Sequence, residues 1–254
     1  MKIQPKIKNN TLNELTSLFY VVIIALAIRI FIVELFFVPT GSMKATILEN
    51  DYIFSTKYSY GYSKHSFPFS PNIFSDRILG SQPQRGDIVI FRPPNNMAIR
   101  YIKRLIGLPG DKIQVINDIV YINDEAIKRT EIGEFKDQTG QLYNKYKETL
   151  ANNVNYFSYK LVHENKINQY SNTEIFYVPS GQYFFLGDNR DESNDSRVDL
   201  GFVPFENFIA KAQFILFSTK EILWLDDNSI MENIARFWFW LNSIRFDRVF
   251  KLLH

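Results

Sequence analysis

Residues 15–33 read LTSLFYVVIIALAIRIFIV, and this stretch decides how the chain is organised. A helix needs roughly 20 predominantly apolar residues to cross a bilayer, and the stretch is about that long if Arg29 reaches towards the membrane interface. It is apolar on all faces and not striped, which disfavours the alternative of a buried core helix. We therefore predict a transmembrane anchor over residues 15–35.

The residues before this stretch indicate its orientation. Lys2, Lys6 and Lys8 lie among ten residues that contain no acid, and such a basic start favours the cytoplasmic side. We expect a cytoplasmic tail over residues 1–14 and a domain over residues 36–254 on the outer side of the cytoplasmic (inner) membrane. A cleaved signal peptide is the alternative, because residues 25–27 (ALA) resemble a cleavage site. The apolar character continues past them, which favours an uncleaved anchor.

Several classes of protein are excluded by the rest of the sequence. No second apolar stretch has spanning length, which excludes a multi-span channel. The net charge of +2 gives no general attraction to nucleic acid. The chain has no cysteine, which excludes a cysteine nucleophile and thiolate metal sites. His65, His163 and His254 are predicted to be surface residues, so neither a zinc site nor a Ser–His–Asp triad is expected.

Short apolar runs separated by turn signals predict a mainly β body. Strands are expected over residues 51–55, 87–91, 99–106, 112–121 and 182–186, with Asn117 and Asp118 in a hairpin turn. The alternative is a doubly wound α/β fold, but amphipathic helices of about 10–15 residues are missing between the strands. The resulting fold class is an antiparallel β body attached to one N-terminal transmembrane helix.

Three further segments differ from this pattern. Residues 58–84 are rich in Ser, Tyr, Phe, Pro and Gly and predict a loop. Residues 128–172 are rich in Asn, Lys, Glu and Tyr, and we interpret them as part of an inserted β-region over about residues 123–180. Residues 230–254 combine aromatic and basic side chains and predict an amphipathic segment, which either docks on the body or lies on membrane lipid.

The segment VPTGSM at residues 38–43 combines proline and glycine directly after the anchor. These residues predict a tight exposed turn that presents Ser42 as an attacking group, with the Thr40 hydroxyl on the same side. By itself this is a weak signal, because most serines beside Pro and Gly are only turn residues.

The segment YIKRLIGLPGD at residues 101–111 places a lysine inside an apolar strand. By alternation Lys103 shares a face with Tyr101 and Leu105. Burial there favours the neutral amine and lowers the pKa of the lysine, and a neutral amine can activate a serine. The alternative is an edge-strand lysine that reaches solvent.

The segment GDNRDESNDSR at residues 187–197 follows an apolar strand and predicts a dense hydrogen-bond network. Calcium binding is an alternative, but the glutamate expected at the end of such a loop is missing. The arginines are better explained as ion-pair partners of the aspartates.

Together with the turn RGDIVIF at residues 85–91, these segments resemble the bacterial type I signal (leader) peptidases in order and in the position of the serine. The resemblance implies a serine endopeptidase that removes signal peptides from exported preproteins after Ala-x-Ala sites, without a metal or cofactor. It implies that Ser42 is the nucleophile and Lys103 the general base. It places Thr40 and the Ser42 backbone N–H in the oxyanion hole.

The resemblance also implies supporting residues. Ser193 takes the place of a hydroxyl that orients the lysine, and Asp195, Arg197 and Arg104 take the places of an ion-pair network. Substrate-binding positions are matched by four residues: Phe36, Val38, Tyr101 and Ile102. The chain departs from the family pattern at Ala45, Ile47 and Asn50, where proline, leucine and glycine are usual. None of these departures touches a reacting group.

Three other functions compete with this interpretation. A β-lactamase-type enzyme needs Ser-x-x-Lys on a helix, and Lys44 has the wrong spacing from Ser42. A self-cleaving repressor shares the Ser–Lys chemistry but carries a DNA-binding domain in place of an anchor. An anchored binding protein remains the non-enzymatic alternative.

Overall fold

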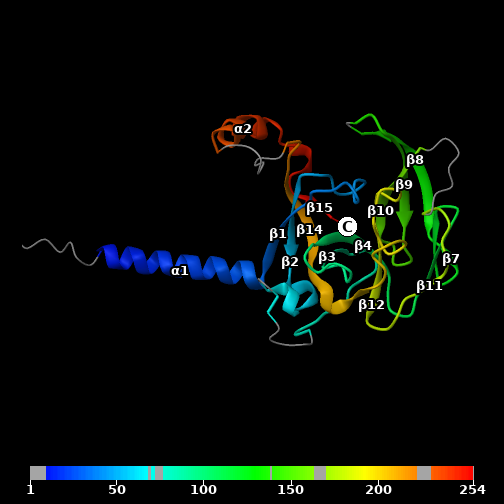
Figure 1. Cartoon of the computed structure of the whole chain (residues 1–254), viewed down its shortest axis with the longest axis horizontal. Helices are drawn as coiled ribbons and strands as arrows, with labels where there is room; N and C mark the ends of the chain where they lie inside the picture. Colours follow the sequence, from blue (N-terminus) through cyan, green and yellow to red (C-terminus); the bar gives the residue numbers. More distant parts are fainter. Residues whose placement is uncertain are drawn as a thin grey trace, which may run out of the picture.

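The computed structural model describes residues 10–67, 70–71, 77–137, 139–162, 170–221 and 230–253. Antiparallel strands build the body, and one long helix projects from it (Figure 1). The predicted mainly β architecture with an N-terminal apolar helix is therefore confirmed.

Helix α1 covers Asn10–Phe31. Its residues 13–31 are long and apolar enough to cross a membrane and bury nothing inside the protein, and no other helix in the described ranges passes this test. Side chains such as Leu18 and Val21 are about 60% exposed, which fits a lipid-facing helix. The helix ends at Phe31, before the predicted boundary at residue 35, because strand β1 (Val33–Phe37) begins there and pairs with β2.

The end of α1 is fastened to the body. The Lys57 ammonium donates to the Arg29 carbonyl at 3.3 Å, and the Tyr62 hydroxyl donates to the Phe31 carbonyl at 2.6 Å. The Lys57 backbone N–H donates to the Ile32 carbonyl at 3.0 Å. These contacts satisfy carbonyls that a helix end leaves without partners. The anchor therefore meets the body at a defined joint.

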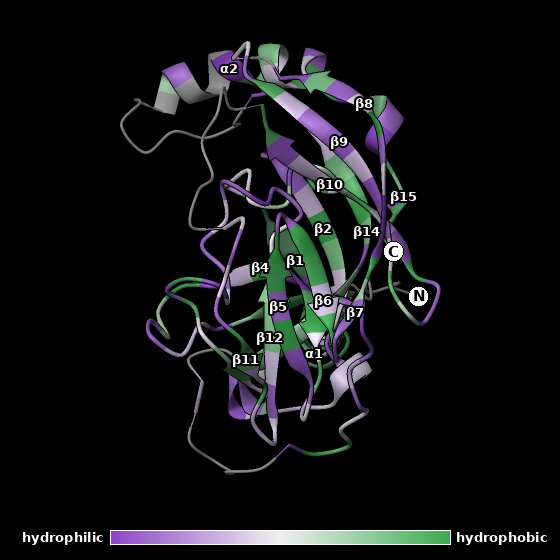
Figure 2. Ribbon diagram, turned by 90° about the vertical axis from the view of Figure 1, so that its right-hand side faces the viewer, coloured by the Kyte–Doolittle hydropathy of each residue, from purple (hydrophilic) through white to green (hydrophobic). Residues whose placement is uncertain are grey.

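The main sheet has the order β1-β2-β14-β3-β4-β12-β13, and β15 pairs with β14. All of these pairs are antiparallel. Hydrophobic residues concentrate along β1 and β2, whereas β9 outside this sheet is largely hydrophilic (Figure 2). The strands are β2 (Asp51–Thr56), β3 (Ile88–Phe91), β4 (Tyr101–Gly107), β12 (Gln182–Leu186), β13 (Val203–Pro204), β14 (Phe208–Ser218) and β15 (Lys251–Leu252). The sequence patterns missed β1, β13, β14 and β15.

Two smaller sheets lie on the side of the body opposite α1 (Figure 1). One pairs β8 (Lys128–Lys136), β9 (Leu142–Thr149) and β10 (Asn155–Leu161); the other has the order β11-β5-β6-β7. The strands of this second small sheet are β5 (Lys112–Ile116), β6 (Ile119–Ile122), β7 (Glu125–Ala126) and β11 (Phe176–Tyr177). Asn117 and Asp118 have positive φ angles of 47° and 68°, as the tight turns of hairpins require. The predicted hairpin is confirmed.

The loop predicted over residues 58–84 contains two 3₁₀ turns, Tyr58–Tyr60 and Lys64–Ser66. Contrary to prediction, His65 in the second turn is buried, with 8% of its surface exposed. The turn is closed by a capping box between Ser63 and Ser66, which fixes the backbone around the imidazole. His163 and His254 lie outside the described residues.

The predicted C-terminal amphipathic segment is helical over α2 (Ile230–Asn242) only. The chain then forms 3₁₀ turn Phe246–Arg248 and strand β15, which pairs with β14. Arg248 donates to the Asp51 carboxylate at 2.5 Å. The end of the segment therefore docks on the body, while Trp238 and Phe239 on α2 are at least 70% exposed. A further 3₁₀ turn, Phe205–Asn207, precedes β14.

Candidate active site

Ser42 and Lys103 meet inside the body. Lys103 Nζ donates to Ser42 Oγ at 2.5 Å, and both residues are buried. Ser42 follows β1 and Lys103 lies on β4, although β2, β14 and β3 separate these strands in the sheet. The sheet must therefore curl to bring the two side chains together.

The surroundings of Lys103 favour a neutral amine. Burial lowers its pKa to about 8, and the charges of Asp195 and Asp188 counteract this only in part. The ammonium lies 5.2 Å from the centre of the Tyr101 ring, on the predicted common face. Its other hydrogen bond in the described structure goes to the Ile102 carbonyl at 3.3 Å. An amine of this pKa can accept a proton near neutral pH.

The loop after β12 holds the nucleophile turn closely. The Asn189 backbone N–H donates to the Ser42 carbonyl at 3.1 Å, and its side-chain amide donates to the Gly41 carbonyl at 3.2 Å. A Cβ atom on Gly187 would lie 2.6 Å from the Ser42 carbonyl oxygen and 2.1 Å from Ser193 Oγ. Only glycine therefore allows this loop to approach the turn.

Ser193 lies at this contact, as the sequence implied, but its hydroxyl does not bind the lysine. The residue is 1% exposed, and Ser193 Oγ has no hydrogen-bond partner in the described structure. A buried hydroxyl without a partner is uncommon. The Ser193 hydroxyl is therefore available for a hydrogen bond that the described structure does not contain.

Asp195 and Arg197 form the predicted ion pair. Arg197 donates to both carboxylate oxygens, at 2.9 and 2.8 Å, and Asp195 also accepts from the Gly187 backbone N–H at 3.0 Å. These groups are buried, and the Arg197 charge holds the pKa of Asp195 below its usual range against the opposing effect of burial. The pair therefore fixes the loop that carries Ser193.

Arg104 was expected in the same network as Asp195 and Arg197. It instead forms a separate ion pair with Asp188. It donates to both Asp188 oxygens at 2.8 Å, and the Thr46 hydroxyl donates to the same carboxylate at 2.5 Å. Thr46 follows the nucleophile turn, so this pair links β4 to that turn. Asp188 and Asp195 thus have arginine partners, whereas Asp191 lies 3.6 Å from the Lys160 ammonium. No metal-binding group of three His, Asp or Glu side chains occurs in the described ranges.

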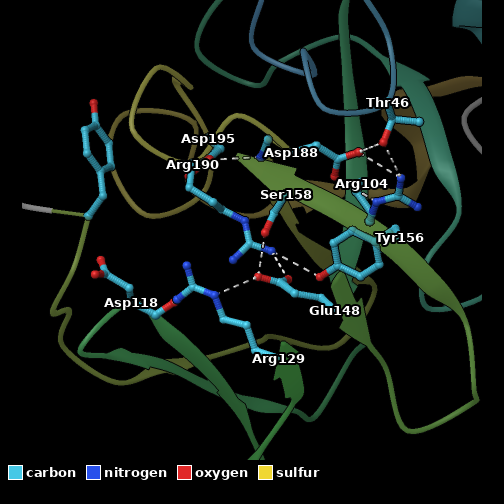
Figure 3. A network of polar contacts seen from close by, with 12 residues as sticks. Thr46, Arg104, Asp118, Arg129, Glu148, Tyr156, Ser158, Asp188, Arg190 and Asp195 are labelled. Atoms are coloured by element: carbon cyan, nitrogen blue, oxygen red, sulfur yellow. Dashed lines mark hydrogen bonds and ion pairs between the residues drawn. The ribbon is translucent and has the colours of Figure 1, made fainter. Parts of the chain in front are cut away.

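A further buried network joins the inserted strands to this site (Figure 3). Glu148 on β9 accepts hydrogen bonds from Arg190 and from Ser158, the latter at 2.8 Å. Arg190 also donates to the Tyr156 hydroxyl at 3.1 Å, and the Arg104 guanidinium stacks 4.3 Å from the Tyr156 ring. No sequence pattern indicated these contacts, because charges in a polar strand look solvent-exposed until a second sheet covers them.

A cleft of about 580 Å³ opens onto Ser42 and Lys103. Of the predicted substrate-binding residues, Phe36, Tyr101 and Ile102 line it, and Thr40 lies exposed at its wall. Val38 does not line it: its side chain is fully buried and packs in the core with Phe36 and Ile102. Six lining residues were missed: Lys44, Glu49, Ile99, Arg100, Glu192 and Asn194.

Lys44 is unsuited to act as a base. It donates to Asp137 at 2.9 Å and to the Tyr143 hydroxyl at 3.3 Å. Burial opposes the charged form, but these hydrogen bonds raise the pKa of Lys44 above its ordinary value. Neither it nor Ser42 lies on a helix. The geometry therefore does not fit the β-lactamase alternative.

Comparison with known proteins shows the family of this chain. The model of the family "Signal peptidase, peptidase S26" matches residues 12–217. A signal peptidase I of Rickettsia canadensis (strain McKiel) is 60% identical, covering 100% of this chain and 98% of that protein. The signal peptidase I of Rickettsia prowazekii (strain Madrid E) is 61% identical, covering 95% of this chain and 93% of that protein.

Among solved structures, a signal peptidase I from Enterococcus faecalis V583 is 32% identical and covers 52% of this chain and 97% of its own, with a TM-score of 0.32. The two Rickettsia proteins carry the assignment, because their similarity extends over almost the whole of both chains. The chain therefore belongs to the signal peptidase family, peptidase S26, as an enzyme of the signal peptidase I type.

Proposed function

We propose that this enzyme is a membrane-bound serine endopeptidase in which Ser42 is the nucleophile and Lys103 the general base. The hydrogen bond of 2.5 Å between Lys103 Nζ and Ser42 Oγ carries the proposal. An amine with a pKa of about 8 within proton-transfer distance of a hydroxyl that lines a cleft supports these two roles. Preproteins are the substrates, and neither a metal nor a cofactor takes part.

The reaction proceeds through an acyl-enzyme. The neutral Lys103 amine accepts the Ser42 proton as the serine oxygen attacks the scissile carbonyl carbon. The peptide C–N bond then breaks, the Lys103 ammonium protonates the leaving amine, and an ester joins Ser42 to the signal peptide. Water hydrolyses this ester with Lys103 again as base, which restores the free serine.

The oxyanion of each tetrahedral intermediate binds to the Ser42 backbone N–H and the Thr40 hydroxyl. Thr40 is exposed at the cleft, so its hydroxyl is accessible to a bound substrate. Two donors aimed at developing negative charge supply a large part of the rate in acyl transfer. The Asp195 charge acts on the Lys103 amine, and the Ser193 hydroxyl, which has no partner in the described structure, orients that amine during the reaction.

The cleft favours an extended peptide with small side chains. Strand β1 ends the main sheet, so its outer edge can pair with an added strand. Phe36 on β1 and Ile102 on β4 narrow the cleft, and Val38 fills the core behind them. We infer cleavage after Ala-x-Ala, because larger side chains meet these walls.

The domain is held at the outer face of the inner membrane. Residues 1–14 lie on the cytoplasmic side, residues 15–31 of α1 span the lipid, and the residues from β1 onward carry the cleft. The lysines before α1 and the exposed apolar surface of residues 13–31 support this orientation. Membrane lipid is therefore a partner of the protein.

Mapping the cut in a purified preprotein tests this function. We expect one cut, directly after the second alanine of Ala-x-Ala, when the products are analysed by mass spectrometry. Leucine in place of that alanine lowers kcat/KM by roughly 100-fold or more, since the added side chain overlaps the pocket wall. Leucine placed well beyond the site in the signal peptide serves as the control. Equal cleavage of both substrates contradicts the proposed pocket.

The pH profile of kcat/KM tests the base. Only the neutral amine accepts the serine proton, so activity rises with pH and reaches half its plateau near pH 8, the pKa of Lys103. Below that pH the rate falls about tenfold per pH unit, because the neutral fraction falls by that factor. A profile that is flat between pH 6 and about 9, once substrate ionisation is corrected, contradicts the assignment of Lys103.

A further inference from the structure

A second pocket, of about 310 Å³, lies where α1 meets the body. Leu26 and Ile30 of α1 give it an apolar side. The charged side carries Arg29, which also belongs to α1, together with Glu34, Lys57, His65, Arg92 and Arg100 of the body. We call this the joint pocket. Its position is the level at which an anchored protein meets phospholipid headgroups.

The charged side of the joint pocket has an excess of positive charge. Four of its side chains are cationic and one is a carboxylate. Glu34 pairs with Lys57 at 3.0 Å and with Arg100, so one anion serves two cations. Neither Arg29 nor Arg92 has an ion-pair partner among the described residues. The site therefore lacks negative charge.

Two buried nitrogens in the joint pocket lack acceptors. His65 Nε2 and Arg92 Nε have no hydrogen-bond partner in the described structure, and His65 is 8% exposed. The other ring nitrogen of His65 contacts the Ser70 hydroxyl at 3.3 Å. Buried donors are rarely left without partners. Burial and the charges of Arg92 and Lys64 lower the pKa of His65.

We propose that the joint pocket binds the phosphate of an anionic phospholipid. Guanidinium groups suit phosphate because their N–H donors match its oxygens in pairs. Arg29 and Arg92 offer such donors, and His65 Nε2 adds a third in its protonated-Nε2 tautomer. The acyl chains then run along the exposed apolar face of α1 past Ile30 and Leu26. A free phosphate ion shares the headgroup chemistry but has no apolar group that could contact Leu26 and Ile30.

The placement of the joint makes such a site useful to the enzyme. The end of α1 is already fastened through Lys57 and Tyr62, and a bound headgroup would fix its depth in the membrane. Arg100 lines both the joint pocket and the active-site cleft. The joint pocket and the active-site cleft therefore share the Arg100 side chain.

Native mass spectrometry of the full-length protein tests this site. Protein extracted from vesicles of equal phosphatidylglycerol and phosphatidylcholine is expected to retain phosphatidylglycerol selectively. Arg29→Gln and Arg92→Gln each lower the retained fraction by roughly tenfold, since each removes one charge-assisted contact. Lys128→Gln removes an exposed charge on β8 and serves as the matched control, with unchanged retention. Equal retention in wild type and both arginine variants overturns the proposal.

A second arm separates the two sources of phosphate. Inorganic phosphate is titrated into delipidated protein while Tm is measured against sodium chloride of equal ionic strength. The lipid assignment is wrong if phosphatidylglycerol is not retained selectively while phosphate raises the Tm of wild type and not that of Arg92→Gln. In that case the site takes free phosphate. Arg29 is exposed, so Arg29→Gln keeps the test valid if Arg92→Gln fails to fold. Retention is read without proteolysis, so its failure leaves the proposed Ser–Lys mechanism untouched.

Discussion

Cleavage of a preprotein is expected to fall by roughly 10³-fold or more in both Ser42→Ala and Lys103→Met. The first variant removes the oxygen that forms the acyl-enzyme, and the second removes the amine that accepts its proton. Because the two groups act as one unit, the double variant is expected to be no slower than either single variant. Single-turnover cleavage of a purified preprotein in detergent measures these rates.

Lys44→Met is the matched control for the loss of a lysine. Lys44 also lines the cleft and lies two positions from the nucleophile, but its ammonium binds Asp137 and Tyr143 and not Ser42. We expect it to retain cleavage within roughly tenfold of wild type, because one part-exposed ion pair contributes little. If Lys103→Met stays active and Lys44→Met does not, the base has been assigned to the wrong lysine.

Stability distinguishes loss of chemistry from loss of folding in these variants. In the folded protein the pKa of Lys103 is lowered from 10.5 to about 8, so below pH 8 the native state carries a buried charge that the unfolded state keeps in water. Lys103→Met removes this penalty, which is on the order of 3 kcal/mol at most. Its Tm is therefore expected to exceed that of wild type at pH 7, with the difference shrinking as the pH rises from 8 to 10.5. A lower Tm at pH 7 contradicts this account.

Arg104→Met is expected to lower stability by roughly 3–5 kcal/mol, the largest structural effect we predict. The substitution leaves the Asp188 carboxylate buried and without its bidentate partner. It also removes the hydrogen bond from Arg104 to the Gly86 carbonyl at 2.9 Å and the stacking on Tyr156. At about 2–4 °C per kcal/mol, Tm falls by roughly 10 °C. Thermal unfolding in detergent measures the change.

Two companion variants show whether the unpaired charge is the cause. Arg104→Met combined with Asp188→Leu removes both charges and should recover part of the lost Tm. Lys112→Met breaks a surface pair with Asp124, whose side chain is 75% exposed, and should change Tm by about 2 °C or less. Similar Tm values for Arg104→Met and Lys112→Met would show that the buried pair contributes no more than a surface pair.

The sequence alone determined the parts of this protein that depend on local pattern. An apolar stretch of spanning length predicts a helix wherever it occurs, and α1 is that helix. Apolar runs between turn residues predicted β2, β3, β4 and β12, and two left-handed residues turn the hairpin at Asn117. Ser42 and Lys103 stood out because each is costly or unusual at its position, a property that neighbours along the chain reveal.

The tertiary structure decided everything that depends on which distant segments touch. Arg104 pairs with Asp188 and not with Asp195, because the curl of the sheet sets which carboxylate faces β4. Val38 lies in the core behind the cleft, His65 is buried at the joint with α1, and Glu148 receives its arginine partner from another sheet. Burial and charge pairing depend on the packing of surfaces far apart in sequence. No local period or residue type encodes those contacts.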